Sequence, residues 1–220
     1  MTRTVLIYGD SNSHGSPPMH DFDGEPRFDR FTRWPGVMAG CLGTDWQVIE
    51  EGLPGRTTVH DDPVDGPHRN GLLILPAILH SHKPIDLIVL MLGTNDLKLA
   101  FAMTPIEIAG GIDKLLRLIA QSECGPQSAA PRVLLIAPPP VLEAGCLAEM
   151  FAGGASKSGH LAKHYAALAT LRGALFLDAG QIIRSSPLDG VHFDAAEHGK
   201  LGRAVADAVN SITFQGEENA

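Results

Sequence analysis

The segment Asp86–Leu92 is the feature of this sequence that most limits how the chain can fold. After its first residue it reads Leu-Ile-Val-Leu-Met-Leu, with no polar side chain to face water. A strand of this kind is covered on both faces, which is typical of the parallel sheets in α/β proteins. It ends at Gly93–Asp96, so polar groups follow directly at its carboxyl end.

Four further strand-like segments alternate with helical patterns along the chain. The expected strands are Thr4–Tyr8, Trp46–Glu50, Arg132–Ala137 and Ala174–Asp178. Helices are expected over 34–42, 71–82, 105–119, 161–171 and 195–212. Two of them begin with a capping-box pattern, at Thr104–Glu107 and at Asp194–Glu197. This order predicts a three-layer α/β/α sandwich around a five-stranded parallel sheet, flavodoxin-like in arrangement.

The composition narrows the class of protein further. With 220 residues and 44% hydrophobic residues, we expect a single domain over 1–215 and a disordered tail at 216–220. A net charge of -8 without a basic cluster gives no footprint for nucleic acid. We expect no membrane span, because no apolar run is long enough, and no signal peptide, because Met1-Thr2-Arg3 leads straight into a strand. The widely spaced cysteines indicate reduced thiols and a cytoplasmic protein.

The first candidate functional segment is Gly9–Gly15, which directly follows the strand Thr4–Tyr8. It places Ser11 at the carboxyl end of a strand, where open α/β sheets bind their ligands. A simpler interpretation is that Ser11 or Asn12 only caps the next helix. A serine hydroxyl becomes a useful nucleophile when a neighbouring base accepts its proton and a third group orients that base.

The sequence offers His192 as that base. In Asp189–His192, an aspartate three residues before a histidine can accept from one imidazole nitrogen, which leaves the other to face Ser11. An ordinary turn would explain the same four residues. Among the other histidines, His60 with its two neighbouring aspartates lacks a second group spaced to complete a metal site. No metal and no cofactor are therefore expected.

Three groups that could stabilise a developing oxyanion also fall at strand ends. They are the backbone N–H of Ser11, a glycine N–H in the loop Gly52–Gly55, and the side-chain amide of Asn95. Taken alone, Gly93–Asp96 could simply be an Asx turn. Together with Asp189–His192, these groups predict acyl-transfer chemistry at the carboxyl edge of the sheet.

These segments, in this order, resemble the four sequence blocks of the SGNH (GDSL-type) hydrolases. The blocks are Gly9–Ser11, Gly52 or Gly55, Gly93–Asp96 and Asp189–His192, and they extend over almost the whole chain. Residues 50–58 and 88–96 are more narrowly similar to the bacterial arylesterase/acyltransferase branch. The resemblance implies the SGNH hydrolase fold, with Ser11 as nucleophile, His192 as base and Asp189 as the group that orients it.

The resemblance also implies the oxyanion hole and the pocket. Besides Ser11 itself, Asn95 is expected as a donor. For the glycine donor the broad family points to Gly52 and the arylesterase branch to Gly55, which we favour. The expected substrate pocket consists of Asn12, His14, Leu53, Pro54, Thr94 and Phe193.

The sequence therefore predicts a serine esterase for small aryl or alkyl esters with short acyl chains, with alcohol or peroxide as acyl acceptors beside water. The acyl and alcohol preference stays open, since Asn12 replaces the family's leucine, and His14 and Ser16 replace aromatic residues of the branch. One alternative is a carbohydrate O-acetylesterase of the same family. Another is a flavodoxin-like binding module for phosphate or flavin, which Asp10 beside Ser11 disfavours.

Two long segments, 15–29 and the lid-like insertion 141–158, are expected to flank the mouth of the site. Both are rich in large apolar side chains: Pro17, Pro18, Met19, Phe22, Phe28, Val141, Leu142, Leu147, Met150 and Phe151. Such side chains pack either on the domain's own core or against another subunit. Following the resemblance to the arylesterase branch, we expect a homo-oligomer larger than a dimer that prefers acetyl to butyryl esters.

Overall fold

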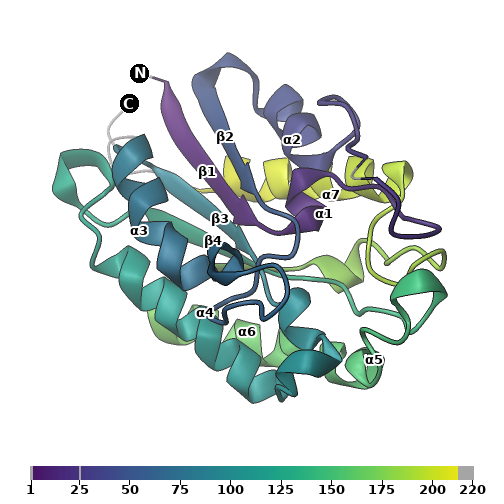
Figure 1. The fold of residues 1–220 in the computed structure, drawn as a ribbon. Coiled ribbons are helices and arrows are strands. Elements are labelled where there is room, and N and C mark those ends of the chain that lie inside the picture. The colour runs from purple at the N-terminus through teal and green to yellow at the C-terminus, as the bar shows by residue number, and fades with distance from the viewer. Residues whose placement is uncertain (1, 25, 213–220) are drawn as a thin grey trace.

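The structure, a computed structural model, describes residues 2–24 and 26–212 (Figure 1). Its centre is a five-stranded sheet in which every neighbouring pair of strands is parallel. The strands are β1 Arg3–Gly9, β2 Trp46–Gly52, β3 Leu87–Met91, β4 Arg132–Ala137 and β5 Leu175–Asp178. Their order across the sheet is β2-β1-β3-β4-β5, which confirms the predicted α/β fold. The tail predicted at 216–220 lies outside the described residues.

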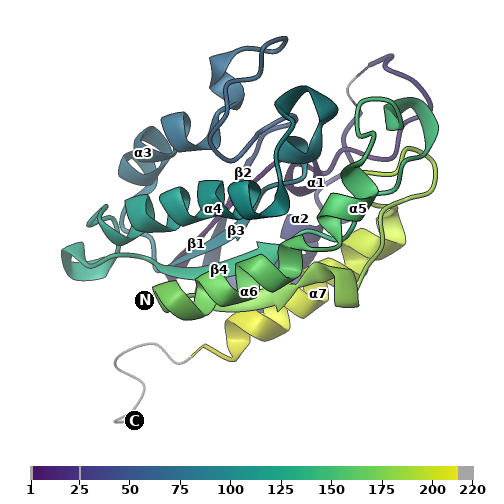
Figure 2. The same ribbon diagram turned by 90° about the horizontal axis from the view of Figure 1, so that it is seen from below.

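Helices cover both faces of the sheet and make it the middle layer (Figure 2). They are α1 Ser11–His14, α2 Trp34–Leu42, α3 Gly71–His82, α4 Pro105–Ala120, α5 Gly154–Ser158, α6 Leu161–Arg172 and α7 Ala195–Asn210. Helices α3, α4 and α6 pack on one face, and α2 and α7 pack on the other. The lid-like insertion expected at 141–158 contains the short helix α5, which the sequence analysis did not predict.

Alternation along the strands explains the two cores. In β1, Leu6 and Tyr8 point to the core under α3, α4 and α6, whereas Val5 and Ile7 point to the core under α2 and α7. All four side chains are fully buried. A strand buried on both faces must be apolar at every position, which is why β1 and β3 read as continuous hydrophobic runs.

The two predicted capping boxes behave differently. Helix α4 begins with the expected box at Thr104–Glu107. The box predicted for α7 was wrong, because the side chain of its N-cap residue Asp194 accepts no hydrogen bond from the first turn of the helix. Oδ1 of Asp194 instead accepts from Oγ of Ser186 at 3.3 Å, and Glu197 accepts from the backbone N–H of Arg184 at 3.0 Å. Both acidic side chains therefore hold the loop before α7.

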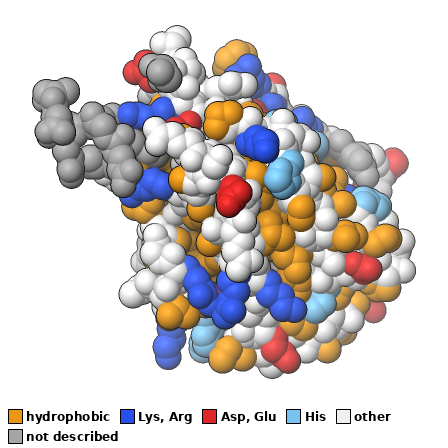
Figure 3. Space-filling model, turned by 90° about the vertical axis from the view of Figure 1, so that its left-hand side faces the viewer, with side chains coloured by type: hydrophobic (Ala, Val, Ile, Leu, Met, Phe, Trp, Pro, Cys, Tyr) orange, Lys and Arg blue, Asp and Glu red, His pale blue; other side chains and the backbone are white. Residues whose placement is uncertain are grey.

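The sheet order places the end of β1 at a switch point. Strand β1 lies between β2 and β3, so the connections from β1 and from β2 leave toward opposite sides. Ligands of open α/β sheets bind outside the carboxyl ends of strands at such a point. Figure 3 shows the face at the left of Figure 1, where hydrophobic side chains are interspersed with lysine and arginine. Within the described residues, no helix has the length and apolar character needed to cross a bilayer.

Candidate active site

Ser11 is the first residue of the one-turn helix α1, directly after β1. The cap of this helix is Asp10, whose Oδ1 accepts from the backbone N–H of Asn12 at 3.0 Å. The helix ends at Gly15, where φ is 92°, in the left-handed region. Because Asp10 supplies the cap, the hydroxyl of Ser11 is left for another partner.

That partner is His192, which the loop between β5 and α7 brings to the end of β1. Nε2 of His192 lies 3.1 Å from Oγ of Ser11, and Nδ1 of His192 lies 2.7 Å from Oδ2 of Asp189. Nδ1–H donates to the carboxylate, so Nε2 accepts from the serine hydroxyl. Ser11 and His192 are each 7% exposed and Asp189 is fully buried, so the chain of hydrogen bonds is shielded from water.

Asp189 holds both its own loop and a distant one. Its Oδ1 accepts from the backbone N–H groups of Val191 and His192, both at 2.9 Å. Its Oδ2 also accepts from the backbone N–H of Met19, again at 2.9 Å. Burial by itself raises the pKa of Asp189, but the hydrogen bond and charge of His192 and the two amides of its loop outweigh burial and lower it. The carboxylate is thus the charged partner that an imidazolium needs.

The expected oxyanion donors occupy the ends of three neighbouring strands. Ser11 follows β1, Gly55 lies after β2 with φ of 76°, and Asn95 lies after β3, and all three line one cavity. Nδ2 of Asn95 donates one hydrogen to the carbonyl of Arg56 at 3.1 Å, so its second N–H is available to a ligand. The alternative glycine, Gly52, is the last residue of β2 and is not part of the cavity wall.

Gly52 has a packing role instead. It pairs with Gly9 of β1, and a Cβ added to it would lie 2.3 Å from the backbone nitrogen of His14. Only glycine allows β2 to approach α1 this closely. The geometry therefore favours Gly55 as the glycine that faces the substrate.

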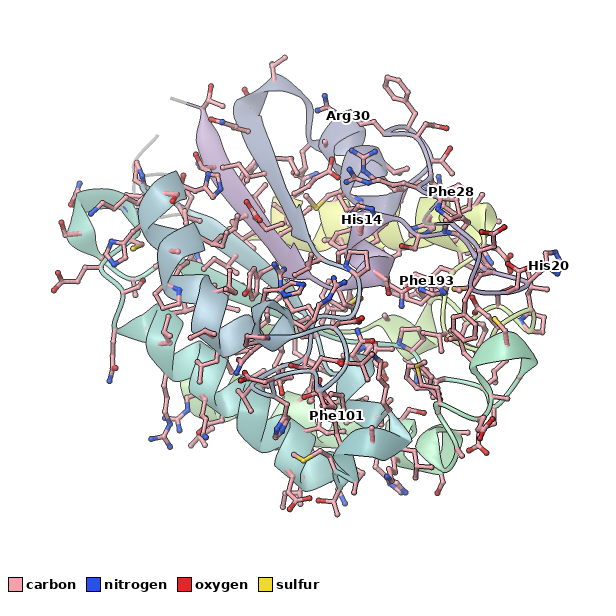
Figure 4. All side chains as sticks on the ribbon, in the orientation of Figure 1. His14, His20, Phe28, Arg30, Phe101 and Phe193 are labelled. Atoms are coloured by element: carbon pink, nitrogen blue, oxygen red, sulfur yellow. The ribbon has the colours of Figure 1, made fainter. Side chains whose placement is uncertain are left out.

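The cavity over Ser11 has a volume of about 520 Å³ and two kinds of wall. One wall is apolar and comes from the segments 15–29 and 141–158: Pro17, Pro18, Met19, Phe22, Leu147, Met150 and Phe151. The polar or charged lining, called the polar wall below, consists of His20, Asp21 and Asp23 from the same segment 15–29 and of Asp65, Arg69 and Lys98 from the loops after β2 and β3. Figure 4 shows His20 far out on the side of the molecule where the strands end.

Two of the six predicted pocket residues, His14 and Pro54, line this cavity. The other four are outside its wall: Asn12, Leu53, Thr94 and Phe193. Asn12 is buried and donates to the carbonyl of Val191 at 3.2 Å, so it fixes the loop of His192. Phe193 is fully buried and its ring lies 5.6 Å from that of His198. These four residues are sequence neighbours of site residues, but their positions in the segments after the strands place them outside the cavity wall.

The sequence reasoning missed the charged pairs in the polar wall. Nζ of Lys98 lies 3.2 Å from Oδ2 of Asp62, and Nε of Arg69 lies 3.7 Å from Oδ2 of Asp65. The preceding motif, Gly93–Asp96, is close enough to Lys98 to have drawn attention to it. Nothing in the irregular segment 62–69 indicated which of its residues would face the cavity.

Two buried carboxylates lie beneath the site. Asp10 is 1% exposed; burial raises its pKa to about 6, although the N–H of Asn12 and the charges of His192 and Arg56 oppose the rise. Asp96 is fully buried and accepts from the backbone N–H and the hydroxyl of Thr58. Burial raises its pKa as well, against those hydrogen bonds. Asp96 links the loops that follow β2 and β3.

The segment at 60–62, considered above as a metal site, has other partners. The ring of His60 lies 5.8 Å from that of Phe101, Asp61 accepts from Nδ2 of Asn70 at 2.8 Å, and Asp62 pairs with Lys98. Over 2–24 and 26–212, no three His, Cys, Asp or Glu side chains gather into a possible metal site.

Some apolar residues of the segments 15–29 and 141–158 pack on the domain's own core, and others stay exposed. Val141, Leu147 and Phe151 fold back on the domain and are at most 6% exposed. By contrast, Phe22 is 62% exposed, Leu142 is 41% exposed and Met150 is 38% exposed. Part of the apolar surface around the mouth therefore has no cover from the described part of this chain.

The chain is similar to a known protein family and to several solved structures. Residues 7–199 match the GDSL-like Lipase/Acylhydrolase family. The solved aryl esterase of M. smegmatis is 41% identical, with 96% of this chain and 100% of that chain covered and a TM-score of 0.92. A carbohydrate acetylesterase from Sinorhizobium meliloti is also 41% identical, with the same coverage and a TM-score of 0.92. No curated protein matched.

Proposed function

Because the chain belongs to the GDSL-like lipase/acylhydrolase family and is a carboxylic ester hydrolase, we propose that it cleaves small short-acyl esters through an acyl-enzyme on Ser11. The observation that carries the proposal is the buried series from Ser11 through His192 to Asp189, with separations of 3.1 and 2.7 Å. Nucleophile, base and orienting acid are in reach of one another, as this chemistry requires.

In the first half of the reaction, Oγ of Ser11 attacks the ester carbonyl while Nε2 of His192 takes the hydroxyl proton. The negative charge on the former carbonyl oxygen is met by the backbone N–H groups of Ser11 and Gly55 and by Nδ2 of Asn95. Asp189 stabilises the imidazolium. The tetrahedral intermediate then expels the alcohol, which takes the proton from His192, and the acyl group stays on Ser11.

In the second half, an acceptor replaces the alcohol. Water gives a proton to Nε2 of His192 as it attacks the acyl carbon. The bond between that carbon and Oγ of Ser11 then breaks, His192 returns the proton to Oγ, and the acid leaves. An alcohol or hydrogen peroxide reacts in the same way and gives a new ester or a peracid. The apolar wall of the cavity disfavours water relative to an organic acyl acceptor. This supports acyl transfer as a second activity.

The two walls suggest how the ester lies. A short acyl chain fits the apolar side beside Met19 and Phe151, and the alcohol part then meets Arg69 and Lys98. Sugar acetates are a second candidate, because the polar wall offers donors and acceptors to hydroxyl groups and because the similar Sinorhizobium meliloti protein is a carbohydrate acetylesterase.

We further propose a homo-oligomer larger than a dimer. Phe22 and Met150 line the cavity and are exposed, and Leu142 is exposed in the same segment as Met150; a neighbouring subunit would cover them and narrow the entrance. This assembly favours acetyl to butyryl esters. Light scattering at micromolar concentration checks it, and a monomer with equal activity on octanoyl esters contradicts it.

The test of the function combines labelling and a substrate series. A fluorophosphonate should inactivate the enzyme and add one phosphonyl group to the peptide that contains Ser11, as read by mass spectrometry. p-Nitrophenyl esters of graded chain length, assayed beside acetylated sugars, then separate the two substrate classes. Full inactivation with the label on another residue would refute the role of Ser11.

A further inference from the structure

Arg56 follows Gly55 in the loop after β2, and its charged side chain is buried. The residue is 3% exposed, and among the described residues no carboxylate forms an ion pair with its guanidinium, although the charges of Glu51 and Asp10 act on it from farther away. Instead its Cζ lies 4.1 Å from the centre of the Tyr8 ring. A buried charge without a carboxylate partner is costly, so its other contacts have to compensate.

One nitrogen of this guanidinium joins two strand ends. Nη1 of Arg56 donates to the carbonyl of Gly9 at 2.8 Å and also to the carbonyl of Glu51. Gly9 ends β1 two residues before Ser11, and Glu51 lies in β2 four residues before Gly55. Fixing the two carbonyls therefore fixes the chain segments that carry the N–H groups of Ser11 and Gly55.

The backbone of the same residue holds the third donor. The carbonyl of Arg56 accepts from Nδ2 of Asn95 at 3.1 Å, which sets the rotation of that amide. The N–H of Arg56 donates to the carbonyl of Leu53 at 3.1 Å, and the N–H of Leu53 donates to Gly9 at 3.1 Å. Side chain and backbone of Arg56 thus contact the supports of all three donors.

We infer that Arg56 is a positioning residue that keeps the three oxyanion donors in register, an inference that rests on the proposed function. Its Nε is buried without a hydrogen-bond partner, so the fold accepts a cost at this position. A lysine keeps the charge but has no planar group to lie on Tyr8 while one nitrogen reaches both carbonyls. Arg56→Lys should therefore keep the positive charge but lose the alignment of the oxyanion donors.

The test is a double-mutant cycle between Arg56→Lys and Asn95→Ala. In the wild-type background, Arg56→Lys should lower kcat by about tenfold or more with KM changed less than about threefold, because only transition-state contacts are misaligned. In the Asn95→Ala background the same change should cost less than in the wild type, because one of the three donors that it misaligns is already gone while those at Ser11 and Gly55 remain. Arg172→Lys, at an arginine paired with Asp113 between α6 and α4, is the control and should keep kcat.

An equal loss of kcat in both backgrounds, or a loss confined to KM, overturns the inference. If Arg56→Lys does not unfold cooperatively, Tyr8→Leu takes its place in the cycle. This change keeps the arginine and removes the aromatic ring that lies against its guanidinium. The loss of kcat caused by Tyr8→Leu must then also be smaller in the Asn95→Ala background than in the wild type. Fluorophosphonate labelling of the wild type separates the two claims. Labelling at Ser11 with no effect of Arg56→Lys refutes only the inference, and absent labelling refutes the proposed function.

Discussion

Ser11 and His192 meet in one cavity, but the regions that hold them are built in different ways. Ser11 and the donors around it follow β1, β2 and β3, and buried polar contacts of Arg56 and Asp96 link these strand ends. His192 lies in the loop between β5 and α7, where the side chain of Asn12 and the backbone N–H of Ser186 hold the loop, but a single carboxylate, that of Asp189, orients the ring.

The oxyanion donors near Ser11 are therefore aligned by a network of contacts, whereas the ring of His192 is oriented by one carboxylate. In the region of Ser11, several contacts share the work, so removing one should cause a partial loss. In the region of His192, Asp189 accepts a hydrogen bond from the ring and another from the backbone N–H of Met19. Removal of that one side chain should therefore be far more damaging.

The largest expected effect comes from the groups that join the two regions. Ser11→Ala and His192→Ala should each lower kcat by about 10⁵-fold or more, and the double variant should lose little beyond either one, because the groups act as a unit. Steady-state assays on a short-chain p-nitrophenyl ester check this, with circular dichroism to verify folding. Multiplying losses in the double variant would mean that the two residues act separately.

Next in size is the loss of the single carboxylate in the region of His192. Asp189→Asn should lower kcat by about 10⁴-fold, because an amide can donate to Nδ1 and stabilise the wrong tautomer. Asp178→Asn, at an aspartate that also caps a short turn after its strand, serves as the control and should stay near wild type. Comparable activity of the two variants would remove Asp189 from the mechanism.

A smaller loss is expected in the region of Ser11. Asn95→Ala should lower kcat by about 10²–10³-fold with little change in KM, since its amide acts mainly on the oxyanion. Asn70→Ala is a matched control: Asn70 caps α3, so its loss should cost about 1 kcal/mol of unfolding free energy and leave kcat unchanged. A raised KM with unchanged kcat would make Asn95 a ground-state binding residue instead.

The sequence predicted the parts of the molecule that depend on local pattern. Continuous apolar runs identified β1 and β3, and the strand order brings Ser11, Gly55 and Asn95 together because each lies within four residues of the carboxyl end of its strand. Their chemical roles stay predictions until variants are assayed.

Other contacts join segments far apart in the sequence, and the hydrophobic periodicity of helices and strands does not predict such contacts. Met19 reaches Asp189 across 170 residues, and Lys98 reaches Asp62 across 36. The capping pattern at Asp194–Glu197 marked the start of α7 correctly, yet nearby donors in the preceding loop took its side chains. Local rules predict where an element begins more reliably than which partner a polar side chain finds.

The smallest expected effect concerns stability in acid, and the two regions should respond with opposite signs. His198 in α7 is fully buried, and its Nδ1 accepts from the backbone N–H of Trp34 at 3.2 Å. Burial, with a smaller contribution from the charge of His192, lowers its pKa to about 4. Below the unfolded pKa of about 6.5 the unfolded chain binds a proton that the folded chain refuses, so His198 destabilises the fold as pH falls.

Asp10 behaves in the opposite sense, because its pKa is raised to about 6 and the folded chain binds its proton first. Acidification from pH 7 to 4.5 should therefore cost the wild type roughly 2 kcal/mol more than His198→Asn, whose Oδ1 can still accept from Trp34. Over the same interval Asp10→Asn should lose the stabilising contribution of Asp10, so its unfolding free energy falls more steeply than that of the wild type. Urea denaturation at both pH values measures the two slopes. If both variants change the pH dependence of the unfolding free energy in the same direction, the prediction of opposite signs for His198 and Asp10 is wrong.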